Sequence, residues 1–371
     1  MTIHALPQRA TSAAPPPAHA PLAQFGFVWF VPVMGWIGLT MAWFQSSPSV
    51  SGIPMTAQLA SLIAVVLFGL VLLTNAVRAW RHPQALMADL RHPVRMAFTA
   101  SGAIALVLMA TLGTLWGLTD ALWVQALWWA GSLLEFSITV WVMSRCLRHA
   151  ESGGLAWPAV TPLLIIPIVG NVLVPLAGLQ WPVQGWVSAQ FGLGLFLWPL
   201  VVGLLLVRWI QAGPLPARMT PTLFILVAPP SAIGLALLQW TAPPVVAWAC
   251  WGVALMSLLW ALSQWRLIAE LPFGMPHWGM SFPLAAFTAL TLRLAQTTDG
   301  RWLQMPATLM LATTSLGFDV SLSQLVLPLL AGACVVHASS LRWLDGAAFV
   351  RLLRDQAVTH VDFPPSVWEV F

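Results

Sequence analysis

Apolar stretches of about 20 residues recur along this chain, and they constrain its fold more than any other feature. They lie near 25–44, 57–77, 96–118, 121–144, 160–179, 186–207, 220–240, 244–265 and 277–296. A bilayer core about 30 Å thick needs roughly 20 apolar residues per helix, and only 7% of all residues are charged. We therefore expect an all-α integral membrane protein with about ten transmembrane helices, the tenth lying between 303 and 341.

Arginines are distributed unequally between the predicted loops. The loops after the even-numbered spans contain Arg78, Arg81, Arg91, Arg95, Arg145, Arg148, Arg208, Arg218 and Arg266. The loops after the first, third, fifth and seventh spans contain no Arg and one acidic residue, Asp120. Because positive residues mark the cytoplasmic side, we expect a cytoplasmic N-terminus, helices paired into hairpins, and a multi-pass protein of the bacterial inner (plasma) membrane.

The chain divides into three predicted regions. Residues 1–21 are rich in Pro and Ala and are expected to form a disordered cytoplasmic segment. Residues 22–302 are expected to form the transmembrane domain with the first nine helices. Residues 303–371 would hold the last helix and an atypical C-terminal tail.

The sequence lacks the motifs of the common enzyme and metal sites. It contains no His-Glu-x-x-His zinc motif, no phosphate-binding Gly-x-x-x-x-Gly-Lys and no Asp-rich metal pair. The net charge of +4 follows from loop arginines, so it does not indicate nucleic acid. We predict no catalytic residues, no metal, no cofactor and no nucleic-acid partner.

Prolines and polar residues inside the spans are the candidate functional positions. The prolines of the odd-numbered spans are Pro32, Pro167, Pro175, Pro229, Pro230 and Pro283. Such prolines survive in a membrane where neighbours or a wet cavity satisfy the freed carbonyls. Two interpretations stay open: kinks that shape a pore lined by odd helices, or the ordinary tolerance of membrane helices for Pro.

Ionisable residues within membrane spans are costly and are functional candidates by default. Glu135, in the middle of the fourth span, is a candidate proton site or a buried hydrogen-bonding group. Arg293 either snorkels to the interface or lies at a pore mouth. Asn171, His92 and Arg95 are further polar groups on odd spans. An apolar pore with Arg at its mouths and few carboxylates would favour anions.

Five motifs in order resemble a known family. They are PVMGWIGLTMAW (32–43), DLRHPVRMAF (89–98), IIPIVGNVLVPLAG (165–178), MTPTLFILVAPPSAIGLA (219–236) and WGMSFPLAAFTALTLRLA (278–295). Each resembles the corresponding odd helix of the tellurite-resistance/C4-dicarboxylate transporter family, which includes the plant guard-cell slow anion channels. The resemblance covers roughly residues 22–300.

The resemblance implies a fold and a gate. Members have ten helices, arranged as five hairpins around a central pore that the odd helices line. They commonly form homotrimers in the lipid bilayer, with one pore per subunit, and they move small inorganic or organic anions such as dicarboxylates, sulfite, halides or nitrate. A Phe in the ninth helix closes the pore, and the motif Ser281-Phe282-Pro283 assigns that role to Phe282.

The tail departs from that family. The stretches TSLGFDVSLSQLVLPLLAGACVV (314–336) and VTHVDFPPSVWEVF (358–371) resemble a fragment of the adenylation domain of non-ribosomal peptide synthetases. That family's phosphate-binding motif is absent, so we predict no adenylating activity. Four functional hypotheses follow: an anion channel, a proton-coupled dicarboxylate or sulfite exporter using Glu135 or His92, an integral membrane enzyme, and a non-functional truncated chimera. The enzyme would need a polar constellation within the spans, which the sequence does not contain.

Overall fold

The computed structural model describes residues 21–46, 55–148 and 154–311. In this part of the chain the regular elements are α-helices and 3₁₀ helices, with no strand. Seven helices are long and apolar enough to cross a membrane: Phe27–Gln45, Met55–Arg81, Arg95–Leu115, Leu122–Leu147, Gln184–Ala212, Ala217–Gln239 and Pro244–Leu262. A shorter apolar helix spans Pro162–Gly178. The all-α membrane fold expected from the apolar stretches is confirmed.

Five helical segments form a closed inner ring. They are α2 (Phe30–Gln45), α5 (Thr99–Leu115), α7 (Ile166–Leu173) continued by α8 (Pro175–Gly178), α10 (Ala228–Gln239) and α14 (Ser281–Ala295). Helix α2 packs on α5, α5 on α7, α7 on α10, α10 on α14, and α14 back on α2. These are the odd-numbered spans of the sequence, and they form the centre of the molecule.

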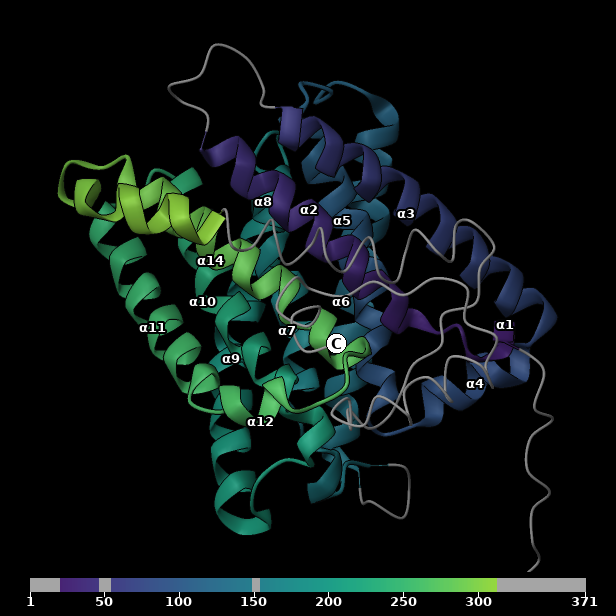
Figure 1. Ribbon diagram of the computed structural model, residues 1–371. Coiled ribbons are helices and arrows are strands. Elements are labelled where there is room, and N and C mark those ends of the chain that lie inside the picture. The colour runs from purple at the N-terminus through teal and green to yellow at the C-terminus, as the bar shows by residue number, and fades with distance from the viewer. Residues whose placement is uncertain (1–20, 47–54, 149–153, 312–371) are drawn as a thin grey trace, which may run out of the picture.

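Four longer helices surround this ring in the described part of the chain. They are α3 (Met55–Arg81), α6 (Leu122–Ser144), α9 (Gln184–Ala212) and α11 (Pro244–Leu262). Each packs on the inner helix that precedes it: α3 on α2, α6 on α5, α9 on α7 and α11 on α10. Helices α3 and α11 lie at opposite outer sides of the bundle, with α2 and α14 between them (Figure 1). The chain therefore alternates between an inner and an outer helix.

Short elements precede most of the inner helices and connect the hairpins. The 3₁₀ helices η1 (Phe27–Trp29), η2 (Arg95–Phe98), η6 (Pro162–Ile165) and η7 (Ala217–Val227) lead into α2, α5, α7 and α10. The short helix α13 (Met275–Trp278) precedes α14. The remaining elements are α1 (Pro21–Gln24), α4 (Pro83–Arg91), η3 (Arg145–Leu147), η5 (Trp157–Ala159), α12 (Trp265–Ala269) and η8 (Thr298–Leu303).

The region between 303 and 341, in which the tenth span is predicted to lie, is described only as far as residue 311. Residues 304–311 are helical. The rest of that region, the C-terminal tail and the N-terminal segment before residue 21 lie outside the described residues. The total of ten helices and the resemblance of the tail therefore stay predictions.

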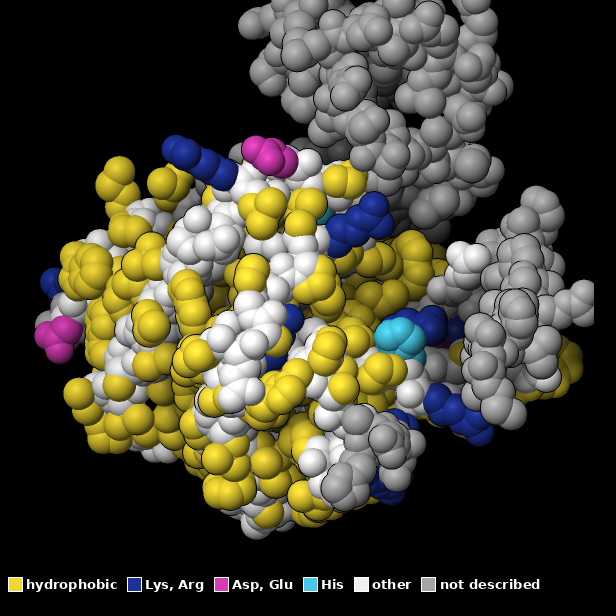
Figure 2. Space-filling view, turned by 90° about the horizontal axis from the view of Figure 1, so that it is seen from below, with side chains coloured by type: hydrophobic (Ala, Val, Ile, Leu, Met, Phe, Trp, Pro, Cys, Tyr) yellow, Lys and Arg dark blue, Asp and Glu magenta, His cyan; other side chains and the backbone are white. Residues whose placement is uncertain are grey.

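A cluster of charged side chains fastens α3 and α4 together. The Arg78 guanidinium lies 2.6 Å from one Asp89 carboxylate oxygen, and Arg95 lies 2.8 Å from the other. Arg78 also donates to the Ala23 carbonyl oxygen at 3.1 Å. Arg78 and Asp89 are buried, so each needs the other to offset its desolvation. Elsewhere the surface is mostly apolar, with few and scattered charges on the face in Figure 2.

Candidate functional site

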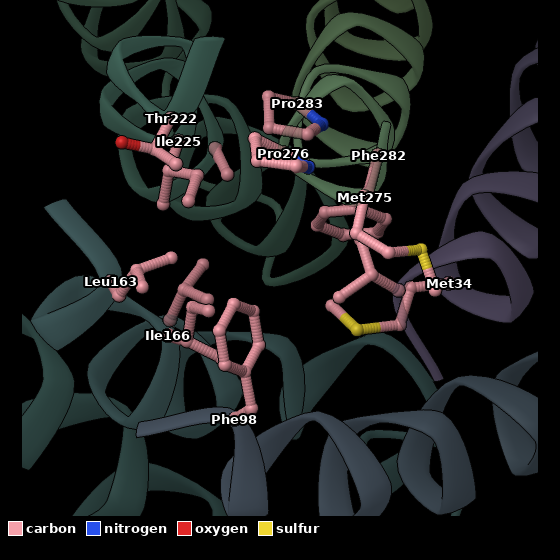
Figure 3. Close-up of a pocket in the computed structure, with 14 residues that line it drawn as sticks. Met34, Phe98, Leu163, Ile166, Thr222, Ile225, Met275, Pro276, Phe282 and Pro283 are labelled. Atoms are coloured by element: carbon pink, nitrogen blue, oxygen red, sulfur yellow. The ribbon is translucent and has the colours of Figure 1, made fainter. Parts of the chain in front are cut away.

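A hollow lies where the inner helices begin, and we call it the first hollow. Its volume is about 510 Å³, including space open to solvent. Its lining comprises Val31, Met34, Phe98, Leu163, Ile166, Val169, Thr222, Ile225, Ala228, Met275, Pro276, Gly279, Phe282 and Pro283. Figure 3 shows these side chains around a central space. Among them, Thr222 alone has a polar side chain, and its hydroxyl donates to the Met219 carbonyl at 2.6 Å.

A second, smaller hollow of about 240 Å³, again including open space, lies further along the same helices. Its lining comprises Gly38, Met41, Leu173, Leu176, Ala232, Leu235, Phe282, Ala286 and Ala289. Phe282 is the residue that both linings share. The Phe282 side chain therefore lies at the boundary between two apolar hollows inside the inner ring.

The backbone of α2 provides the surface against which Phe282 packs. A Cβ atom at Gly38 would lie 3.1 Å from the Phe282 ring atom Cδ2 and 3.1 Å from the Cβ of Ala285. Phe282 is only 4% exposed. The absence of a side chain at position 38 thus leaves just enough room for the phenyl ring between α2 and α14.

The six prolines predicted from the odd spans share one structural position. Pro32, Pro167, Pro175, Pro229, Pro230 and Pro283 all lie within the first three residues of an α-helix. A first-turn Pro costs no intrahelical hydrogen bond, because that N–H has no helical partner. In α2, α7 and α10 these residues follow a 3₁₀ helix. They mark the places where inner helices change geometry, and Pro283 also lines the first hollow.

His92 and Arg95 lie before α5 and outside both linings. The His92 Nδ1 accepts hydrogen bonds from the backbone N–H groups of Val94 and Arg95, each at 3.1 Å. Burial lowers the pKa of His92, and the neighbouring Arg95 lowers it further against an opposing effect of Asp89. His92 in its neutral form thus caps the start of the third span.

Arg293 lies in the last turn of α14, at the opposite end of that helix from Phe282. Its side chain is exposed. Its Nη1 is 3.5 Å from the Gln296 Oε1, and Gln296 in turn donates to the Gln45 carbonyl at 2.6 Å. Arg293 is not among the residues that line either hollow.

Asn171 belongs to a buried set of side chains between α6, α7 and α9. We call this set, Ser132, Thr139, Asn171 and Gln190, the α6–α7–α9 polar network. The Asn171 amide donates to the Thr139 hydroxyl at 2.8 Å. The Gln190 amide donates to the Asn171 side-chain oxygen at 3.1 Å and to the Ser132 carbonyl at 2.9 Å. The network ties two outer helices to the inner ring, and Asn171 is not among the residues that line either hollow.

Glu135 lies beside this network but takes no side-chain hydrogen bond from it. Its side chain is fully buried, and neither carboxyl oxygen has a partner among the described residues. No group of three or more His, Cys, Asp or Glu side chains that could hold a metal occurs in the described ranges.

Sequence reasoning missed several residues of the hollows. Met34, Gly38, Thr222 and Met275 were not singled out, because apolar residues, glycines and a single hydroxyl in an apolar segment carry no distinguishing signal. They lie on other helices than Phe282, so no spacing along the sequence relates them to it.

Comparison with known proteins agrees with this architecture. The chain is similar to two uncharacterised transporters of Methanocaldococcus jannaschii. One is 25% identical over 294 residues, covering 73% of this chain and 84% of the relative. The other is 27% identical over 249 residues, covering 61% and 70%. The sequence model of the voltage-dependent anion channel family matches residues 24–320. With that match over most of its length, and with the resemblance in its odd helices confirmed, the chain belongs to the voltage-dependent anion channel family.

Proposed function

We propose that the inner ring forms a pore for small anions and that Phe282 is its gate. The observation that carries the proposal is the position of Phe282 at the boundary of two apolar hollows. An apolar constriction excludes water and hydrated ions until its side chain moves. Rotation of one phenyl ring would then join the hollows into a continuous path.

Electrostatics of the first hollow favour anions. The described lining contains no carboxylate, so cations would meet no counter-charge.

The proposal extends to the setting of the pore. We infer a bacterial inner membrane with a cytoplasmic N-terminus, from the arginine distribution. By family resemblance we also infer a homotrimer in lipid and substrates such as C4-dicarboxylates, sulfite, halides, nitrate or tellurite. The proline positions at helix starts support a role in bending the inner helices around the pore. A coupled exporter is the second candidate, and the buried Glu135 is the observation that favours it.

The direct test compares anion flux through the wild type and Phe282→Ala in proteoliposomes. Removing only about 1.4 kcal/mol from the permeation barrier raises the rate about tenfold, so we expect flux to rise on the order of tenfold or more. Phe196→Ala, on the exposed surface of α9, is the matched control and should behave like the wild type. Equal flux through wild type and Phe282→Ala, with both proteins intact in the vesicles, would refute the gate.

A further inference from the structure

Glu135 is a buried ionisable residue that does not line either hollow. It lies in the middle of α6, an outer helix, and is fully buried. A Cβ atom at Gly170 would lie 2.1 Å from the Glu135 Oε1. The carboxyl group therefore packs directly on the backbone of α7, at a position where any residue other than Gly would collide with it.

The polar groups around Glu135 have no donor left for it. Both hydrogens of the Asn171 amide are engaged, by the Thr139 hydroxyl at 2.8 Å and the Pro167 carbonyl at 2.9 Å. Both hydrogens of the Gln190 amide are engaged within the α6–α7–α9 polar network. The Thr139 hydroxyl donates to the Pro167 carbonyl. The network is complete without Glu135, and an ionised carboxylate would find no hydrogen bond in it.

Among the residues that the structure describes, no opposite charge faces Glu135 either. Its helix α6 packs on α5 and α7 and is hydrogen-bonded to α9. Helices α5 and α7 contain no charged or titratable residue, and Glu135 is the single one in α6. Helix α9 contains Arg208, which is 18 residues beyond Gln190 and thus about 27 Å further along the helix. A carboxylate at this place would be an unpaired charge in the membrane, which is costly.

The site is separated from the anion path by one helix. Val169, the neighbour of Gly170, lines the first hollow together with Ile166 from the preceding turn. Leu173, one turn later, lines the second hollow. Glu135 thus contacts the back of the same helix whose front forms the pore wall on both sides of Phe282.

We propose that Glu135 is a proton-binding site at the back of the pore wall, and that release of its proton reduces anion flux. The inference rests on the proposed pore function. The neutral carboxyl fits the dry, donor-free packing against Gly170 that the structure has. Ionisation places a negative charge within about 10 Å of the anion path, roughly one helix diameter. At an effective dielectric constant near 20, that repulsion lowers anion flux on the order of tenfold.

The test measures chloride flux from proteoliposomes at symmetric pH values from acid to alkaline. Phe282→Ala is the background, so that the gate does not mask the effect. We expect flux to fall on the order of tenfold as the pH rises. Glu135→Gln, nearly isosteric and never charged, should stay at the acid level at every pH. Glu270→Gln, which removes an exposed carboxyl next to α12, should keep the pH dependence of its parent.

A pH profile that is unchanged by Glu135→Gln, or a parent that shows no pH dependence, would overturn the proposal. Infrared spectroscopy of the purified full chain separates this result from failure of the pore itself. Glu135 should give a C=O band of a protonated carboxylic acid that disappears on alkalinisation and is missing in Glu135→Gln. If Phe282→Ala does not conduct, the pore proposal fails, while the infrared band still confirms or refutes proton binding. Glu135→Met provides the same neutral comparison if the Gln variant does not fold.

Discussion

The inner and outer helices of this protein are both apolar, yet they bury very different shares of their surface. In the three long inner spans, Phe27–Gln45, Arg95–Leu115 and Ala217–Gln239, 72%, 83% and 83% of the most apolar window is buried. The corresponding share is 33% for α3 and α6, and 22% for α9 and α11. Outer helices therefore expose apolar side chains over most of their length, whereas inner helices are mostly buried within the bundle.

The difference teaches that hydropathy defines a membrane span but not its place in the bundle. Lipid tails are as apolar as Leu, so lipid contact and protein contact select the same residue types. What distinguishes the inner helices is their broken geometry. Helices α2, α5, α7 and α10 each continue a 3₁₀ helix. The outer helices α3 and α9 instead run as single α-helices of 27 and 29 residues, α9 even with Pro199 in its interior.

The largest loss of stability is expected when a side chain is added at a glycine where an inner helix touches outer helices. A Cβ at Gly178 would lie 2.5 Å from the Trp128 Cζ2 and 2.7 Å from the Val187 Cγ2. Gly178→Leu should therefore lower the free energy of unfolding by about 3 kcal/mol or more through overpacking. Chemical unfolding in detergent micelles would measure the change.

The matched control is Gly203→Leu in α9, where a Cβ meets nothing within 4 Å. Its effect should stay within about 0.5 kcal/mol, as for other substitutions away from packed features. If both variants lost equal stability, the division into a packed inner ring and lipid-facing outer helices would be wrong.

Much of this division could be predicted from the sequence, because it follows from one-dimensional signals. The alternation of Arg-rich and Arg-free loops gives hairpins, and prolines mark four of the five odd spans that become the ring, although Pro199 lies in the outer helix α9. The short connections between spans then force each outer helix beside its inner partner. None of this needs knowledge of side-chain packing.

The candidate site was less predictable, because it depends on which side chains meet. Phe282 could be chosen only through resemblance, since a Phe in an apolar helix has no local signal. His92 was expected near a pore, whereas its ring nitrogen accepts two backbone N–H groups before α5. Glu135 was noticed for its cost in a membrane, but its contact with Gly170 depends on the approach of two helices.

A smaller loss of stability is expected when the hydrogen bonds that join α9 to the inner ring are removed. Gln190→Leu removes the hydrogen bonds to the Ser132 carbonyl and the Asn171 side chain. Such bonds between membrane helices contribute about 0.6 kcal/mol on average and up to about 1.7, so we expect a loss of about 1 kcal/mol. Gln211→Leu, exposed near the end of the same helix, should change stability little. Equal losses in the same detergent unfolding assay would show that the network does not fasten the outer helix.

The smallest change in stability is expected from His92, which lies before the inner helix α5, and it depends on pH. Because the pKa of His92 is lowered in the folded protein, chiefly by burial, the unfolded chain binds more protons in acid. Stability should therefore fall once the pH drops below about 6.5, the ordinary value for His, and the loss should level off below the lowered pKa. Protonation also removes the Nδ1 acceptor used by Val94 and Arg95.

His92→Asn tests this, since its side-chain oxygen can accept the same N–H groups without titrating. Thermal unfolding followed from pH 8 to pH 5 should show a slightly smaller loss of stability in the variant than in the wild type. The difference should be under about 0.5 kcal/mol, because the imidazole is partly exposed and water screens its charge. Identical acid sensitivity in both proteins would mean that protonation of His92 does not reduce the stability of the start of α5.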